Sequence, residues 1–153
     1  MSQPRGEHSY RVAAWWTSGS CGLAKSESVP NAIHFTAPKE FGGLEGRWIP
    51  EELLLAALTG CFTTTLRSIA GTAEFEFTDF QVEASGVVHK SQLGYGFSEI
   101  VISPTLKIAC SEERERALDL LKRAETLCLV SRTIDVPLRF EPKIEVTEPV
   151  IAV

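Results

Sequence analysis

The sequence predicts an α+β protein built from antiparallel sheets, and two alternating periodicities along the chain support this fold class. Apolar residues recur at every second position, as in strands, in three regions: 10–37, 75–109 and 138–146. Two regions between them, 50–70 and 111–127, have the apolar pattern and the end signals of helices. The predicted order is therefore strands, helix, strands, helix, strand, within a single domain over residues 1–153.

The N-terminal region is predicted to form short antiparallel strands. Apolar side chains alternate with others over residues 10–16, and the pattern returns over residues 33–35. Gly19 and Gly22 interrupt it, as turn residues do between paired strands. A glycine-rich connection follows over residues 37–46, and after it the periodicity changes.

A long helix is predicted from about Pro50 to about Ala70. Proline suits the first helical position, where its missing N–H is no loss, and the two glutamates that follow favour the positive end of the helix macrodipole. Gly71 marks the predicted end. The run Leu53–Leu58 is apolar on every side, so we expect neighbouring elements to bury it from several directions.

The region from 75 to 109 predicts two long hairpin strands around a turn at Gly94–Gly96. Pro104 has no backbone N–H, so its strand is expected at an edge or at a bulge. Ser111 and the two glutamates after it form the signature of a helix N-cap with an acidic first turn. They predict a second helix that continues to about Leu127.

The composition describes one acidic globular domain. The chain has 153 residues, of which 44% are hydrophobic, and its formal charge is −5, from 15 Lys and Arg against 20 Asp and Glu. A chain of this length buries roughly 68–70% of its unfolded surface, so it can form a full core without disulfides or metals. The acidic balance argues against general nucleic-acid binding and against attraction to anionic membranes, since both need positive charge.

No segment is predicted to direct the chain to a membrane or across one. The longest unbroken apolar run, Leu53–Leu58, is far below the roughly 18 residues that cross a bilayer. The first eight residues lack the apolar stretch of a signal peptide. We therefore expect a cytoplasmic protein.

Four cysteines lie at positions 21, 61, 110 and 128, without the CxxC or paired Cys/His spacing of a zinc site. Buried, inert thiols are one interpretation of all four in a reducing compartment. A redox pair is the other interpretation. Cys61 and Cys128 lie on the two predicted core helices, and two such cysteines can approach closely enough to form a disulfide.

In such a pair the two cysteines have different predicted roles. Cys128 lies at the C-terminal end of its helix, where the negative end of the macrodipole disfavours a thiolate. It is therefore a poor first nucleophile and a better resolving thiol. Cys61 lies in the middle of its helix and needs a cation to lower its pKa.

Two cysteine-containing segments resemble those of the OsmC/Ohr family. The first is residues 50–62, PEELLLAALTGCF, preceded by Ala37-Pro38 and Phe41-Gly42-Gly43. The second is residues 124–131, AETLCLVS, whose cysteine follows the first by 67 positions. The predicted order of strands and helices agrees with the family, and the resemblance covers nearly the whole chain.

The resemblance implies an intertwined homodimer in which curved antiparallel sheets wrap around two central helices. It also implies a thiol-dependent peroxidase that reduces organic hydroperoxides in oxidative or osmotic stress. By analogy, Cys61 is the peroxidatic thiolate that becomes a sulfenic acid, and Cys128 resolves it as a disulfide that an external dithiol reduces. The resemblance implies no metal, haem or flavin. Glu51 matches the family glutamate that orients an activating arginine.

The position of Glu51 adds a constraint to this analogy. Glu51 and Cys61 are ten residues apart, about 15 Å along one helix, so they do not share a site within a single helix. If both serve one thiolate, the glutamate comes from the partner subunit. The dimer is then part of the active site.

The activating arginine of the family is absent from both places where the resemblance predicts it, residues 18–22 and 33–39. Arg47, just before the first helix, is the predicted substitute, with Lys39 and Arg11 as further candidates. Without a nearby cation a mid-helix thiol stays mostly protonated at pH 7, because desolvation raises its pKa. The alternative is therefore a redox-inactive dimer of the same family that binds a small apolar ligand in its interface cleft.

Two further positions depart from the family pattern. Leu129 stands where a proline is common after the second cysteine, and we expect it to alter how Cys128 is presented. Trp48 stands before Pro50, where the hydroperoxidases usually have small polar residues. We interpret Trp48 as packing in the core or in the dimer interface.

Overall fold

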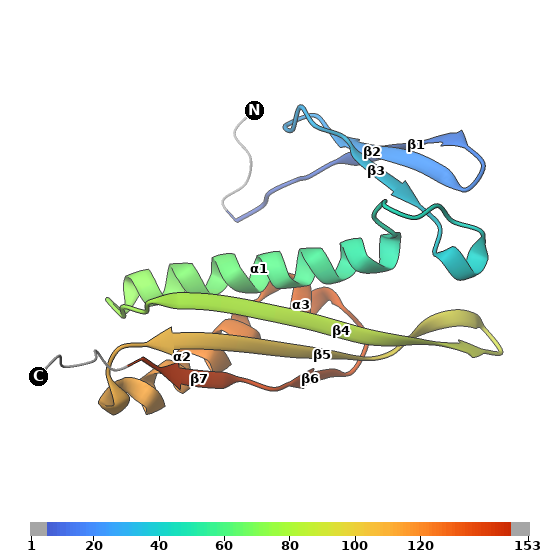
Figure 1. Ribbon diagram of the computed structural model, residues 1–153. Helices are drawn as coiled ribbons and strands as arrows, with labels where there is room; N and C mark the ends of the chain where they lie inside the picture. Colours follow the sequence, from blue (N-terminus) through green and yellow to red (C-terminus); the bar gives the residue numbers. More distant parts are fainter. Residues whose placement is uncertain (1–5, 148–153) are drawn as a thin grey trace, which may run out of the picture. The chain divides into compact units, whose positions relative to one another are not determined.

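The structure, a computed structural model, describes residues 6–147 and divides into two compact units (Figure 1). The first unit ends at Leu54 and the second begins at Leu55, within helix α1 (Pro50–Thr72). Each unit contains antiparallel strand pairs, and helices accompany them. The predicted α+β class with antiparallel sheets is therefore confirmed.

The first unit contains a three-stranded antiparallel sheet in the order β1-β2-β3, formed by Val12–Ser18, Cys21–Ser26 and Ile33–Thr36. These strands fall in the predicted N-terminal region. The strands pack closely at Gly22, where a Cβ would lie 2.6 Å from the Phe35 ring. Any other residue at this position would force the ring to move.

A compact turn region joins β3 to α1, as its glycines predict. It contains the short 3-10 helix η1 (Lys39–Phe41). A Cβ on Gly43 would lie 1.6 Å from the carbonyl oxygen of Ala37, so only glycine fits there. The region closes where the Thr36 N–H donates a hydrogen bond of 2.9 Å to the carbonyl of Trp48.

Helix α1 starts at Pro50 as predicted and ends two residues later than expected, at Thr72. One row of its side chains at four-residue spacing is buried: Leu58, Phe62, Leu66 and Ala70. On its other sides the helix is less covered, and Leu54 is 37% exposed. The burial on every side that the apolar run predicts is therefore not reached within one chain.

By length and composition alone, α1 would suffice to cross a membrane. Thr59 and Gly60 interrupt the apolar run of this helix without adding charge, so the length of the unbroken run alone did not predict this. Core helices of soluble proteins pass the same test, and the buried row of α1 belongs to the core of the second unit. The hydropathy of one helix is therefore weak evidence for a membrane span.

The second unit is built on a long antiparallel hairpin of β4 (Asp79–Ser91) and β5 (Gly94–Ile108). Gly94 already pairs with Ser91, so the turn is Gln92-Leu93 and not the predicted Gly94–Gly96 segment. Two short strands, β6 (Leu138–Phe140) and β7 (Lys143–Val146), pair with β5 in parallel. The single last strand predicted over 138–146 is thus split in two, at Pro142, which has no N–H to donate.

Strand β5 is central in this sheet, which corrects the edge position or bulge predicted from Pro104. Strand β4 pairs along one side of β5. On the other side, β6 pairs with Ile100–Ile102 and β7 with Thr105–Ile108. Pro104 lies in the gap between these two pairings, so its missing N–H interrupts neither ladder.

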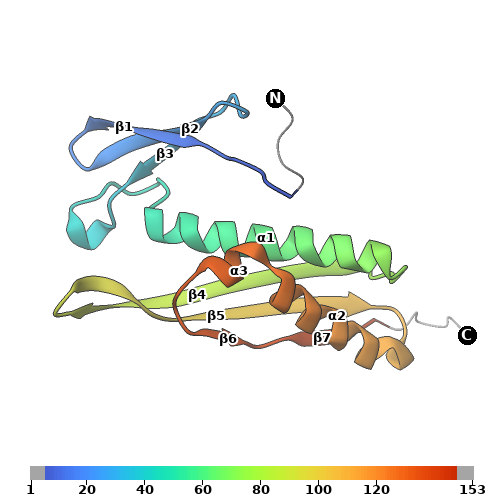
Figure 2. The same cartoon turned by 180° about the vertical axis from the view of Figure 1, so that it is seen from behind.

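Helix α2 (Arg114–Leu127) ends where predicted, but its start differs. Residues Ser111–Glu113 form a 3-10 turn, η2, and neither this turn nor α2 has a side-chain cap, so the predicted Ser111 cap is wrong. One residue after α2 the short helix α3 (Leu129–Thr133) begins, which the sequence pattern did not predict. Figure 2 shows α2 and α3 in front of the strands of the second unit.

The core of the second unit joins the buried row of α1 to the sheet and to α2. Phe62 of α1 stacks on Phe80 of β4 with ring centroids 6.0 Å apart. Alternate residues of β5 and the inner face of α2 complete the core, with these buried side chains: Ile100, Ile102, Leu106, Ile108, Ala117, Leu120, Leu121 and Ala124. Cys128 belongs to the same core, so its position is fixed by packing on several sides.

Candidate functional site

Two of the four cysteines meet inside the second unit. Cys61 lies on α1 directly before the buried Phe62, and Cys128 is the residue that joins α2 to α3. Their side chains are hydrogen-bonded to each other, and both are free thiols. Cys128 is fully buried and Cys61 is half-buried, so a reagent from solvent meets Cys61 first.

The break between α2 and α3 brings backbone N–H groups to Cys61. The N–H of Cys128 still closes α2, with a hydrogen bond of 2.9 Å to the Ala124 carbonyl. The chain then turns at Cys128, which has φ −62° and ψ 114°. The N–H groups of Leu129 and Val130, in the first turn of α3, have no partner within that helix. Both hydrogen-bond to the Cys61 sulfur.

These contacts decide the acidity of Cys61. Burial raises the pKa of the Cys61 thiol, but hydrogen-bond donors outweigh burial, and the pKa is lowered from its ordinary value. In decreasing order of effect, the donors are the Val130 N–H, the Cys128 thiol, the Thr65 hydroxyl and the Leu129 N–H. All four are uncharged. Within the described chain, therefore, hydrogen bonds favour the thiolate, whereas the sequence argument requires a cation.

Cys128 is shifted in the opposite direction. Burial raises the pKa of the Cys128 thiol to about 11, and its hydrogen bond to Cys61 and the negative charges of Cys61 and Glu125 act in the same direction. The Ser131 N–H, which hydrogen-bonds to the Cys128 sulfur, opposes them. Cys128 is the less acidic thiol, as the sequence predicts, but burial is the first cause and not the helix macrodipole.

Two polar residues accompany Cys128. The buried Ser131 donates a hydrogen bond of 2.9 Å from its hydroxyl to Oε1 of Glu125. The other carboxylate oxygen, Oε2, is buried and has no hydrogen-bond partner among residues 6–147. Burial raises the pKa of Glu125, and the hydrogen bond from Ser131 opposes this increase. Glu125 is thus a half-buried carboxyl group with one free oxygen in the second unit.

Glu51, the predicted orienting residue, lies in the first turn of α1 and belongs to the first unit. Its Oε2 is buried and accepts no hydrogen bond from the part of the chain that the structure describes. Ten residues of α1 separate Glu51 from Cys61, so the helix does not bring these two side chains together.

The three candidate cations for Cys61 all lie in the first unit, whereas Cys61 lies in the second. Arg47 is exposed and lines a shallow pocket of about 230 Å³ together with Trp48 and Glu52. Lys39 forms an ion pair with Glu45, five residues before α1 begins. The fold of a single unit therefore does not bring Arg47 or Lys39 to the thiol pair.

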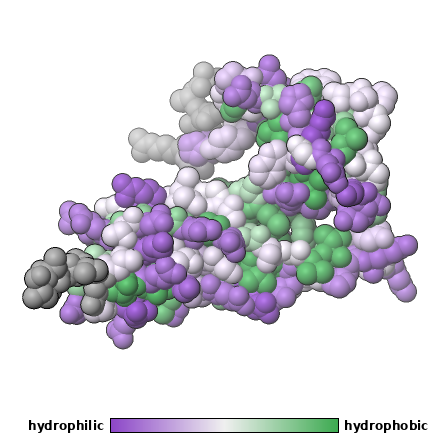
Figure 3. Space-filling model, viewed as in Figure 1, coloured by the Kyte–Doolittle hydropathy of each residue, from purple (hydrophilic) through white to green (hydrophobic). Residues whose placement is uncertain are grey.

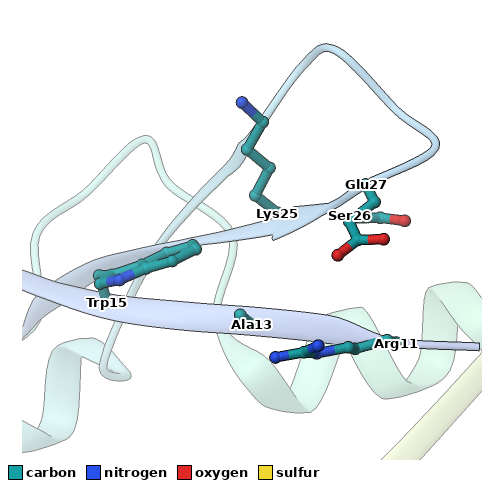
Figure 4. A pocket seen from close by; sticks show the side chains of 6 residues that line it. All are labelled: Arg11, Ala13, Trp15, Lys25, Ser26 and Glu27. Carbon is teal, nitrogen blue, oxygen red and sulfur yellow. The ribbon is translucent and has the colours of Figure 1, made fainter.

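Arg11, the third candidate, lines a pocket of about 410 Å³ along β1 and β2, which Figure 4 shows from close by. Trp15, Lys25 and Glu27 are among the other residues that line it. The residues named as lining this pocket all belong to the first unit, and Cys61 and Cys128 are not among them.

Sequence reasoning did not identify Thr65, Glu125 and Ser131, although the spacing of Thr65 and Glu125 from the two cysteines contains a signal. The Thr65 hydroxyl is 4.0 Å from the sulfur of Cys61, one helical turn earlier. Glu125 precedes Cys128 by three residues, and Ser131 follows it by three. Positions three and four apart share a helix face. This rule does not predict the position of Ser131, because a helix break separates it from Cys128.

The arrangement supports chemistry between two thiols. An acidic, accessible thiol in contact with a buried, less acidic thiol can cycle between the dithiol and the disulfide. Among residues 6–147, no three His, Cys, Asp or Glu side chains are grouped in a way that could hold a metal ion.

The sequence matches a known protein family. The profile of the family described as OsmC-like protein matches residues 43–143, which include both cysteines of the pair. Uncharacterized protein YmaD of Bacillus subtilis (strain 168) is 26% identical to the chain over 144 residues, which cover 91% of this chain and 96% of that protein.

Solved structures give similar folds. An OsmC-like protein of unknown function, VCA0330 from Vibrio cholerae, has a TM-score of 0.78 at 15% identity, with 89% of this chain and 99% of that chain covered. An organic hydroperoxide resistance protein from Elizabethkingia anophelis has a TM-score of 0.72 at 22% identity, with 92% and 99% covered. At these identities the likeness establishes the fold.

Proposed function

The chain belongs to the OsmC-like family, and from this membership and its paired thiols we propose that it is a thiol-dependent peroxidase that reduces organic hydroperoxides. One observation favours this activity above all: in a hydrogen-bonded pair of free thiols, the more accessible thiol is the more acidic. Cys61 is the proposed peroxidatic thiol and Cys128 the resolving thiol. The similar hydroperoxide resistance protein supports this substrate class.

The proposed reaction has three steps. The Cys61 thiolate attacks an oxygen of the hydroperoxide, so that an S–O bond forms, the O–O bond breaks, and the alkoxide leaves and takes a proton to become the alcohol. The Cys128 sulfur then displaces the oxygen of the Cys61 sulfenic acid as water, and a disulfide forms. An external dithiol reduces this disulfide by exchange and returns both cysteines to free thiols.

We also propose a homodimer, because the single chain leaves large apolar side chains in water. Trp15, Trp16 and Trp48 of the first unit are 54%, 76% and 51% exposed. Figure 3 shows other apolar side chains at the surface, in green among polar ones. Soluble monomers rarely expose extensive apolar surface. An intertwined dimer would cover these side chains and the open sides of α1, and would place Trp48 in the interface.

In this dimer, Glu51 and Arg47 are proposed to act on Cys61 of the partner subunit. The buried Oε2 of Glu51 has no hydrogen-bond partner in the described chain, and a buried carboxylate oxygen without a donor is costly. A guanidinium is the strongest donor to such an oxygen. Arg47 is the nearest arginine in the sequence, and Glu51 would hold it as a positioning residue.

The reducing cytoplasm is the proposed location, because the cycle needs a dithiol pool that keeps Cys61 and Cys128 reduced between turnovers. Thiols supply both electrons, so the proposed cycle uses no metal, haem or flavin. We propose that residues 1–153 form one domain, since the family match crosses the boundary between the two units.

The test is stoichiometric oxidation. The reduced protein receives one equivalent of cumene hydroperoxide, and free thiols are counted before and after. We expect the count to fall from four to two, with a Cys61–Cys128 link identified by mass spectrometry. Cys21→Ser and Cys110→Ser are the matched controls and should form the same link. Retention of all four thiols would overturn the proposal.

A second candidate function is a dimer of the same family that binds a small apolar ligand without turnover. The observation that favours it is the missing arginine in residues 18–22 and 33–39. The pKa of Cys61, measured from the rate of iodoacetamide alkylation against pH, separates the two functions. A value above about 8.5 favours the binding protein, and a value below about 7 favours the peroxidase.

A further inference from the structure

Ser131 connects the resolving cysteine to a carboxyl group. Its backbone N–H hydrogen-bonds to the Cys128 sulfur, and its hydroxyl donates to Oε1 of Glu125 at 2.9 Å. Glu125 lies near the end of α2, three residues before Cys128, which directly follows that helix. Its remaining oxygen, Oε2, is buried and has no hydrogen-bond partner in the described chain. Ser131 thus links a carboxyl group with one unpartnered oxygen to the buried thiol, and the negative charge of this carboxyl group acts on the thiol.

We propose that Glu125, held in place by Ser131, accepts the thiol proton of Cys128 when the disulfide forms. This inference rests on the proposed peroxidase function and adds a residue to its second step. The sulfenic acid of Cys61 is the group that Cys128 attacks.

The step balances in atoms and electrons. The proton of the Cys128 thiol moves to Oε2 of Glu125, and the Cys128 sulfur attacks the sulfur of the Cys61 sulfenic acid. The S–S bond forms as the S–O bond breaks, and the hydroxide that leaves takes the proton from Glu125 as water. The sulfur of Cys128 is oxidised, that of Cys61 is reduced, and Glu125 returns to its carboxylate form.

Cys128 needs a base because it is rarely ionised by itself. With a pKa of about 11, roughly one Cys128 thiol in ten thousand is a thiolate at pH 7. Burial raises the pKa of Glu125, which makes its carboxylate a stronger base than an exposed glutamate. The charge of Glu125 also disfavours the Cys128 thiolate, so Cys128 is a protonated thiol when it meets the sulfenic acid.

Glu125→Gln is the substitution that separates proton transfer from structural support. The glutamine amide oxygen still accepts the hydrogen bond from Ser131, but it does not take a proton. The reduced variant is mixed with cumene hydroperoxide and quenched at intervals. Dimedone traps the Cys61 sulfenic acid, and mass spectrometry measures the disulfide with Cys128. We expect sulfenic acid to form at the wild-type rate and the disulfide to form about a hundredfold more slowly.

Three further variants complete the experiment. Glu115→Gln removes the same charge from an exposed position of α2 and should leave both rates unchanged. Ser131→Ala keeps the carboxylate without its anchor and should slow disulfide formation by a smaller factor. In Glu125→Ala, added formate should restore part of the rate, which no structural role of Glu125 would explain.

Two negative results have different meanings. If Glu125→Gln forms the disulfide at the wild-type rate while the wild type oxidises normally, the inference about Glu125 is wrong and the peroxidase stands. If the wild-type protein forms no sulfenic acid at Cys61, the peroxidase itself is wrong and the role of Glu125 is overturned with it.

Discussion

Leu129 shows how one residue can change the acidity of a thiol through its backbone. Its N–H is one of the donors to the Cys61 sulfur. Proline, which is common at this place in the motif that the sequence resembles, has no N–H to donate. The leucine therefore adds a donor to a thiol whose expected arginine is missing from residues 18–22 and 33–39.

Leu129→Pro should make Cys61 less acidic without unfolding the site. Leu129 is the first residue of α3, where proline is well tolerated, and the extended ψ of 114° at Cys128 suits a residue that precedes proline. Because a charge-assisted hydrogen bond is lost, we expect alkylation of Cys61 by iodoacetamide at pH 7 to slow by roughly three- to tenfold. Leu129→Ala, which keeps the N–H, is the matched control. Equal alkylation rates in the two variants would contradict this assignment.

The raised pKa of Cys128 predicts how stability depends on pH. The thiol has an ordinary pKa of 9.0, taken here for the unfolded chain, and a pKa raised by burial to about 11 in the folded chain. The folded state therefore prefers the protonated thiol, and this preference contributes to the free energy of unfolding. The contribution is fully present below pH 9 and is lost between about pH 9 and 11. Its size is about 2–3 kcal/mol for a shift from 9.0 to about 11.

Urea unfolding of the wild type and of Cys128→Ser at pH 8, 9, 10 and 11 measures this contribution. Serine does not titrate, so the difference in free energy of unfolding between the two proteins isolates the cysteine. We expect the free energy of unfolding of the wild type to fall, relative to that of Cys128→Ser, as the pH rises. A difference that stays constant over this range would show that the pKa of Cys128 is not raised.

At the scale of elements, local patterns in the sequence predicted the helices and the long strands well. The start of α1, the end of α2 and the β4–β5 hairpin follow from periodicity and end signals, which are properties of neighbouring residues. The parallel pairing of β6 and β7 with β5 depends on residues far apart in the chain, so no local pattern predicted it. The error at Pro104 has the same cause, because the gap that accommodates proline is made by two distant strands.

Gly86 and Gly71 offer a test of packing within these elements. A Cβ at Gly86 in β4 would lie 2.7 Å from the ring of Phe97, whereas a Cβ at Gly71 in α1 would meet nothing within 4 Å. Gly86→Ala should therefore destabilise the protein by about 1–3 kcal/mol, because the ring must move. Gly71→Ala should stabilise it by about 0.5–1 kcal/mol, because alanine suits a helix better than glycine.

Thermal or urea unfolding of both variants checks these signs. Gly71→Ala also serves as the control, since it adds the same methyl group where space is open. Equal effects of the two substitutions would mean that Phe97 does not pack against Gly86 as described.

At the scale of the whole molecule, the sequence predicted part of the candidate site. Cys61 and Cys128 could be proposed as a pair because each lies among core residues of a predicted helix, and the structure brings them together. The contact between Glu125 and Ser131 could not be predicted, because it exists only after the chain turns at Cys128. The environment of Glu51 could not be predicted either, since a donor for its buried oxygen is not in the described chain.

Mixed dimers test whether two chains complete one site. Glu51→Ala chains and Cys61→Ser chains are each expected to be nearly inactive alone. When equal amounts exchange subunits, half of the dimers are mixed, and each mixed dimer contains one site with both native residues. We expect roughly a quarter of the wild-type peroxidase activity to return on this statistical basis.

Native mass spectrometry confirms that mixed dimers have formed before activity is measured. The Glu51→Ala and Cys61→Ser proteins combined without subunit exchange are the control and should stay inactive. If mixed dimers are present and no activity returns, Glu51 does not serve Cys61 of the partner subunit.

The pairing of Cys61 with Cys128 also gives the protein two forms, a dithiol and a disulfide, which differ in how α1 is joined to the α2–α3 turn. In the dithiol, α1 is joined to the α2–α3 turn only by hydrogen bonds and packing around the two sulfurs. In the disulfide, the 68 residues from Cys61 to Cys128 become a covalent loop. Closing a loop of this length reduces the entropy of the unfolded chain and so destabilises the unfolded state by about 4 kcal/mol in the chain-entropy model. The oxidised protein should thus melt at a higher temperature than the reduced protein, so each turnover would pass through a form that is harder to unfold.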